Sequence, residues 1–244
     1  MSSPVTRKDA GAYLGGGTTV ELAQRDFEVL KLTRTFSQLA STHITELLFS
    51  DRSHAVPDRV LGRLVKLSYL SRVGRRATGE KGGAGAYVYQ LGRAGRLLLG
   101  VDGRLSRAVN NHSLLIADIY LELRRAERQG VLVVNDWAVE RPVPPSVRAD
   151  LFVSVEYPEQ RRQSSYFIEA DLGTEPLRTI REKVEGYWQA VEMSEEDYFP
   201  YVVFVMRDRG RLREIDRLIL RLEEQREMVR TCLSGEVTQH LANL

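Results

Sequence analysis

The chain has little cysteine and no long apolar run. Its 244 residues include a single cysteine, Cys232, which excludes an internal disulfide framework and fits a reducing compartment. No apolar stretch approaches the length of a membrane-spanning helix, and the N-terminus lacks the basic-then-apolar order of a secretion signal. We therefore expect a cytoplasmic protein with no membrane partner.

The charge of the chain is divided unevenly along its length. Residues 1–108 hold 17 Lys and Arg against 9 Asp and Glu, a formal charge of +8, whereas residues 109–244 hold 18 against 24, a formal charge of −6. A basic first half indicates a polyanionic partner such as nucleic acid. The alternative is that these basic side chains only solvate the surface.

A basic amphipathic segment follows Val56. Pro57 suits the first position of a helix, because its missing N–H has no partner there in any case. Apolar residues recur at helical spacing and predict a buried face: Val60, Leu61, Leu64, Leu67 and Leu70. Arg59, Arg63 and Lys66 follow one another at i, i+4 and i+7 and form a second, cationic face.

A basic, glycine-rich turn comes next and leads into a strand over 87–91. The turn carries Arg75, Arg76 and Lys81. A basic helix followed by a hairpin is the layout of a winged helix-turn-helix, in which the helix enters the major groove and the hairpin tip lies on the phosphates. We predict DNA contacts from both elements: Arg59, Arg63, Lys66, Arg75, Arg76 and Lys81.

The periodicity of the remaining sequence predicts two domains after a disordered tail over 1–18. The winged helix occupies 19–108, with a first helix over 20–36. The second domain, 109–244, is expected to be a sheet with helices packed on it, an α/β unit within an α+β protein. Its expected elements are a helix over 111–128, strands over 131–134, 149–155, 165–171 and 201–206, and helices over 175–191 and 212–229. The segment 137–140 either continues the first of these strands or begins another. Pro142, Pro144 and Pro145 interrupt the strand pattern.

Three acids stand at the expected ends of strands in the second domain. Glu169 and Asp171 share one sheet face because strand side chains alternate, and Asp150 joins them if the two strands are neighbours. Carboxylates gathered in this way repel one another unless a cation or basic side chains lie among them, and oxygen clusters suit Mg²⁺. The group is either a structural, vestigial cluster or a working metal site.

This second domain resembles the PD-(D/E)xK nuclease superfamily. The resemblance rests on the element order, on Ala149-Asp150 and on Glu169-Ala170-Asp171. It implies a catalytic set of Asp150, Glu169 and Asp171 with Mg²⁺ as metal. Asp171 stands where the superfamily has lysine, and Lys183 on the next helix would supply that charge.

The chain also resembles a narrower family, the replication-relaxation proteins of plasmids, phages and mobile elements, over residues 22–206. The matching segments are Arg25-Asp26, Arg63-Leu64, Tyr87 to Gly92, Ala149 to Leu151, Phe167 to Glu175, and Lys183 with Tyr187. The resemblance implies a DNA-binding role in replication, mobilisation or transcription control.

Three functions remain open from the sequence. We favour a regulator that binds double-stranded DNA as a homodimer, without a cofactor, and that carries an inactive nuclease-like domain. The alternative is a Mg²⁺-dependent endonuclease targeted by its winged helix. A protein–protein adaptor in a replication or mobilisation complex is the third.

Overall fold

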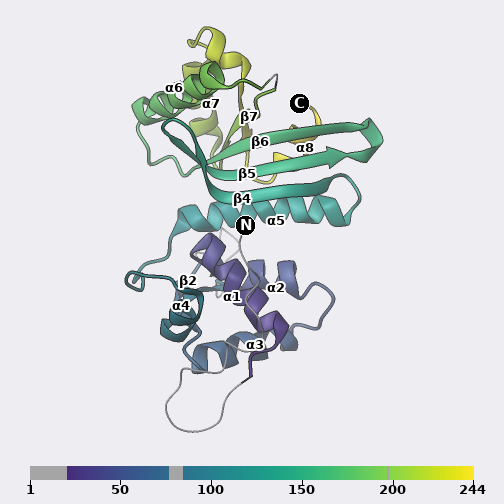
Figure 1. Cartoon of the computed structure of the whole chain (residues 1–244), viewed down its shortest axis with the longest axis vertical. Helices are drawn as coiled ribbons and strands as arrows, with labels where there is room; N and C mark the ends of the chain where they lie inside the picture. The colour runs from purple at the N-terminus through teal and green to yellow at the C-terminus, as the bar shows by residue number, and fades with distance from the viewer. Residues whose placement is uncertain (1–20, 77–84, 197) are drawn as a thin grey trace. The chain divides into compact units, whose positions relative to one another are not determined.

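The computed structural model describes residues 21–76, 85–196 and 198–244 and has a mixed α+β fold. The chain divides into two compact units, Met1–Val109 and Asn110–Leu244. Each unit has its own sheet, one of three strands and one of five (Figure 1). The predicted tail over 1–18 and Lys81 lie outside the described residues. No helix of the described part is long and apolar enough to cross a membrane.

The first unit is a helical cluster closed by a small antiparallel sheet. Its elements are α1 (Gln24–Phe36), β1 (Leu39–Ala40), α2 (Ser41–Leu48), α3 (Ala55–Lys66), β2 (Leu70–Arg75), β3 (Tyr87–Leu91) and α4 (Arg93–Leu99). The strands lie in the order β1-β3-β2. Its fully buried core includes Val29, Leu30, Ile44, Leu61 and Leu64.

The basic helix differs from its prediction at both ends. Helix α3 begins at Ala55, so Pro57 is its third residue and not its first. Proline is tolerated there because the first four N–H groups of a helix have no intrahelical acceptor. The helix ends at Lys66, and Leu70, expected on its apolar face, is the first residue of β2 and is buried.

The second unit is built on a five-stranded mixed sheet. Its elements are α5 (Asn111–Arg128), β4 (Val133–Val143), β5 (Val147–Tyr157), η2 (Pro158–Gln160), β6 (Arg162–Asp171), α6 (Leu177–Met193), β7 (Tyr201–Met206), α7 (Arg209–Ile219), η3 (Glu224–Glu227), β8 (Val229–Leu233) and α8 (Val237–Ala242). The strands lie in sequence order from β4 to β8. Pairing is antiparallel from β4 to β6 and parallel from β6 to β8.

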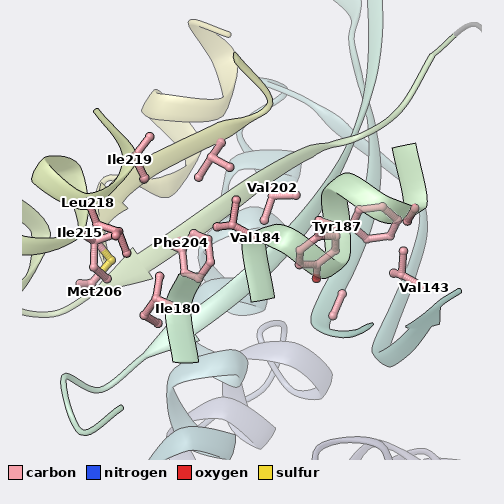
Figure 2. Close-up of a cluster of buried hydrophobic side chains, with 14 of the residues drawn as sticks. Val143, Ile180, Val184, Tyr187, Val202, Phe204, Met206, Ile215, Leu218 and Ile219 are labelled. Atoms are coloured by element: carbon pink, nitrogen blue, oxygen red, sulfur yellow. The ribbon is translucent and has the colours of Figure 1, made fainter. Parts of the chain in front are cut away.

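Helices cover both faces of this sheet. Helices α6 and α7 pack on one face through an apolar cluster that Figure 2 shows, with Ile180, Val184 and Tyr187 from α6 and Ile215, Leu218 and Ile219 from α7 over strand residues such as Val202 and Phe204. Helices α5 and α8 contact each other and lie against the other face. The interior strand β7, between β6 and β8, is buried from Val202 to Met206, as a strand covered on both faces must be.

Three predicted elements of this unit were wrong in extent. Strand β4 runs through Pro142, which is accommodated because β4 is an edge strand and one side of its backbone needs no partner. Helix α6 begins at Leu177, so Glu175 precedes it. The predicted helix over 212–229 is instead α7, which stops at Ile219, followed by η3 and by β8, whose buried Val229 pairs with Val202.

Candidate functional site

Two of the three predicted cations of α3 are exposed. Arg59 and Lys66 both lie on the surface, and Arg59 donates from Nε to the carbonyl oxygen of Ala55 at 3.2 Å. Long cationic side chains in this setting are available for phosphates or base edges. Helix α3 ends at Lys66, so this cation also lies where the helix dipole favours positive charge.

The third predicted cation, Arg63, is held within the unit. Its Nη2 lies 2.6 Å from Oδ1 and 2.8 Å from Oδ2 of Asp26, whose carboxylate is buried at the start of α1. Asp26 also accepts a hydrogen bond from the backbone N–H of Ala23, which caps the helix. Arg63 therefore joins α3 to α1, and a structural role accompanies the predicted DNA contact.

The hairpin presents an arginine pair on an aromatic ring. The guanidinium carbons of Arg72 and Arg75 lie 4.3 Å and 3.8 Å from the ring centre of Tyr87. In a regular strand, residues three apart point to opposite faces, but the register of β2 shifts between Arg72 and Gly74. This bulge brings both arginines to one ring. Arg72 was not predicted, since no period-2 pattern indicates it.

Arg75 and Arg76 have further partners near the base of the hairpin. Arg75 donates from Nη1 to the carbonyl oxygen of Gly85 at 2.7 Å. Arg76 Nη1 lies 3.3 Å from Nε2 of His43, a buried side chain whose Nδ1 accepts from the N–H of Ala40. The described part of the hairpin thus holds its arginines close to the strands.

In the second unit, Asp150 lies inside β5 and not at its start. Its Oδ2 accepts from the N–H of Ala170 on β6 at 2.8 Å, which places it beside the neighbouring Glu169. Its Oδ1 lies 3.0 Å from Nε2 of His112, in the first turn of α5. This hydrogen bond raises the pKa of His112 above its ordinary value, against the lowering effect of burial.

The buried Glu169 pairs with the half-buried Lys183 beside Asp150. Glu169 is 1% exposed, and Lys183 Nζ lies 3.0 Å from its Oε2. Tyr187, one helical turn beyond Lys183 on α6, donates its hydroxyl to Oε1 at 2.6 Å. Lys183 also lies 3.2 Å from Oε2 of Glu175. The structure therefore brings together the predicted Asp150, Glu169 and Lys183.

The charges of this group perturb one another. Burial raises the pKa of Glu169 to about 7, and the neighbouring Asp150 adds to the rise, while Lys183 and Tyr187 oppose it. Burial lowers the pKa of Lys183, but its three carboxylate neighbours raise it by more: Glu169, Asp150 and Glu175. The pKa of Lys183 is therefore raised overall.

Asp171 belongs to a separate ion pair. Arg211 on α7 places Nε 2.8 Å from Oδ2 of Asp171, and the N–H of Gly173 donates to Oδ1. Arg211 is 10% exposed and Asp171 only 2%. The prediction that the side chains of Glu169 and Asp171 share one face agrees with this geometry, but each is neutralised by a different helix.

This arrangement does not fit a magnesium ion. Every carboxylate oxygen of Asp150, Glu169 and Asp171 faces a protein donor or cation, and within the described residues no three His, Cys, Asp or Glu side chains gather as metal ligands do. Mg²⁺ takes six oxygen ligands in nearly octahedral geometry. Binding it here requires displacement of Lys183 or His112.

Two of the basic side chains that pair with these acids were not predicted from the sequence. His112 and Arg211 lie 38 and 40 residues from their carboxylate partners, Asp150 and Asp171. No local spacing indicates pairs that distant. The sequence does indicate that His112 lies in the first turn of a helix, because Asn110 caps α5 by accepting hydrogen bonds from the N–H groups of His112 and Ser113. It does not indicate that this turn faces Asp150.

Comparisons with known proteins identify the family. No curated protein matches the chain. The family model described as replication-relaxation matches residues 30–201, which span most of the first unit and the second unit as far as the first residue of β7. This family ties the chain to the replication or mobilisation of mobile elements. Because the match extends over well more than half of the sequence, the chain belongs to the replication-relaxation family.

Proposed function

We propose that the chain is a double-stranded DNA-binding protein whose first unit is a winged helix. The order α1-β1-α2-α3-β2-β3 with the sheet order β1-β3-β2 supports this, since it sets a helix immediately before a two-stranded hairpin. The observation that carries the proposal is the cationic surface of these two elements. Arg59 and Lys66 are exposed on α3, and Arg72 and Arg75 share the ring of Tyr87 on the hairpin.

In this proposal the two elements do different work. Helix α3 lies in the major groove, where Arg59 and Lys66 reach base edges or the flanking phosphates. Arg72 and Arg75 meet the DNA backbone, because both are exposed and lie over the ring of Tyr87, and guanidinium groups pair well with phosphates. Arg76 and Lys81 remain predicted phosphate contacts. A site near the protein's own gene, bound by a homodimer, is the expected target.

The second unit acts in this proposal as a nuclease-like scaffold. Its order of helix, three antiparallel strands, helix and parallel strand supports the PD-(D/E)xK likeness. The ion pairs of Lys183 with Glu169 and of Arg211 with Asp171 support a structural role for the acids. Removing one partner of such a pair leaves a charge on a buried carboxylate without its partner, which is costly.

DNA binding is tested by fluorescence anisotropy with a labelled duplex that flanks the gene, titrated at several salt concentrations. Arg59→Ala/Lys66→Ala is compared with Lys31→Ala/Arg34→Ala, which removes two exposed cations from α1. If both α3 residues contact phosphates, the slope of log K against log salt falls by about two units for the first variant only. An equal loss of DNA affinity in both variants contradicts the proposal. So does the absence of salt-dependent DNA binding by the unaltered chain, a result that favours the protein adaptor.

One observation keeps the endonuclease as a second candidate. Lys183 lies beside Glu169 and Asp150, where the resemblance needs a cation near the scissile phosphate. We expect no nicking of supercoiled plasmid in Mg²⁺ or Mn²⁺ by the unaltered chain. Nicking that is lost in a folded Glu169→Gln variant establishes the enzyme and refutes the scaffold.

A further inference from the structure

An open aromatic hollow lies at the C-terminal end of α6, away from the acids described above. It has a volume of about 560 Å³ and is bounded by α6, the start of β7 and η3. Its lining residues are Trp188, Val191, Tyr198, Phe199, Tyr201, Glu224, Glu227 and Met228. Four aromatic rings and two carboxylates line the opening, and of these lining residues Phe199 and Met228 also pack against the core of the unit.

The aromatic walls are held in place before anything binds. Trp188 donates from Nε1 to Glu192 at 3.0 Å, and the Tyr198 hydroxyl exchanges hydrogen bonds with the backbone of Ser165 at 3.2 and 3.3 Å. Phe199 packs on Phe167, with ring centres 5.6 Å apart. Rings fixed in this way lose little freedom on binding. Tyr198 nonetheless remains 49% exposed.

The charge of the hollow indicates a cationic occupant. Glu224 and Glu227 are both exposed on η3, so their carboxylates are solvated and available. A guanidinium already lies 4.8 Å from the ring centre of Tyr201, contributed by Arg230 of the chain itself. Aromatic faces with adjacent carboxylates attract cations and repel phosphates.

We propose that this hollow is a docking site for an arginine-bearing segment of a protein partner. The arginine stacks between the aromatic walls and pairs with Glu224 and Glu227, while apolar neighbours in the segment cover Val191 and Met228. Arginine suits this site better than lysine, because its planar group stacks on rings and forms paired hydrogen bonds with carboxylates. Among the described residues, the only charged ones in the lining are Glu224 and Glu227, which favours a cationic side chain over a phosphate.

The probe is the peptide acetyl-Leu-Arg-Leu-Arg-Leu-amide, with its citrulline counterpart as the uncharged isostere. Isothermal titration calorimetry with the full chain should give about tenfold tighter binding of the arginine peptide. Glu224→Gln/Glu227→Gln should remove most of this preference, and Trp188→Leu should weaken the binding of both peptides. Glu156→Gln/Glu159→Gln, which neutralises two exposed acids outside the hollow, should keep the preference.

Three results overturn the proposal. The first is no binding of the arginine peptide by the unaltered chain at 1 mM peptide, on the order of the weakest affinity that a specific contact gives. The second is an equal loss of preference in both glutamate variants. The third is self-association by sedimentation without peptide that Trp188→Leu abolishes, which assigns the hollow to a second copy of the chain.

Discussion

Replacing Lys183 by methionine removes the counter-charge of a buried carboxylate while keeping most of the apolar stem of the side chain. Glu169 is 1% exposed and Lys183 27%, with 3.0 Å between Nζ and Oε2. At that distance and an effective dielectric constant of about 20, the attraction amounts to about 5 kcal/mol, which is an upper limit on the loss. Protonation of Glu169 removes its charge and so reduces the loss of stability.

The pH dependence follows from the pKa of Glu169, which burial raises to about 7 from its ordinary 4.5. A carboxyl with a raised pKa in the folded state destabilises the fold increasingly as pH rises from the unfolded to the folded pKa, and by a constant amount above it. Without Lys183 the folded pKa lies higher still. The variant therefore continues to lose stability above pH 7, where the unaltered chain no longer does.

The expected deficit of Lys183→Met is smallest at pH 6, where most of Glu169 is protonated, and grows to a few kcal/mol, roughly 2–3, by pH 9. Urea unfolding followed by tryptophan fluorescence measures it, because Trp137 and Trp188, the only two tryptophans, both lie in the second unit.

The matched control is Arg178→Met on the same helix. Arg178 is 87% exposed and pairs with a surface Glu182, so its loss should change stability by less than about 0.5 kcal/mol at every pH. A deficit for Lys183→Met that is the same at pH 6 and pH 9 refutes the reasoning, as does a deficit equal to that of the control. Adding Glu169→Gln to Lys183→Met should recover stability at pH 9, because the buried carboxylate is then removed and the other former partner, Glu175, is partly exposed to solvent.

Two further predictions concern packing and pairing. Arg63→Ala should destabilise the first unit by about 2–3 kcal/mol in thermal unfolding, since Asp26 stays buried without its guanidinium partner, and an unchanged melting temperature would show that the pair is dispensable. Gly186→Ala should lower the free energy of unfolding by about 1–3 kcal/mol, because its Cβ would lie 2.3 Å from a Val147 methyl group. In contrast, Gly62→Ala in α3 meets nothing within 4 Å and should raise that free energy by about 0.5–1 kcal/mol. A change of the same sign in both variants would contradict the structure.

Local pattern was sufficient where an element carries its own signals. Helix α5 begins and ends as predicted, from Asn111 to Arg128, because Asn110 caps its start and an apolar stripe runs its full length. Strand β7 was likewise predicted over its whole extent, Tyr201–Met206, because a short uninterrupted apolar run is typical of a buried strand.

Local pattern failed where a distant partner decides. The apolar spacing of α7 continues past Ile219, so periodicity alone extended the helix to Val229. Strand β8 forms there because β7 offers an open parallel edge, to which Val229 pairs at Val202. Such a pairing requires a sheet that is already assembled, and no short window of sequence contains it.

The sequence by itself determined the α+β class, the uneven charge of the two halves and the shared face of Glu169 and Asp171, because these depend on composition and on the periods of helix and strand. Only the tertiary structure decided which cation meets which acid: Arg63 with Asp26, His112 with Asp150, Lys183 with Glu169 and Arg211 with Asp171. Charges attract over distance in space and not along the chain, so their partners become known only when the elements that carry them are packed.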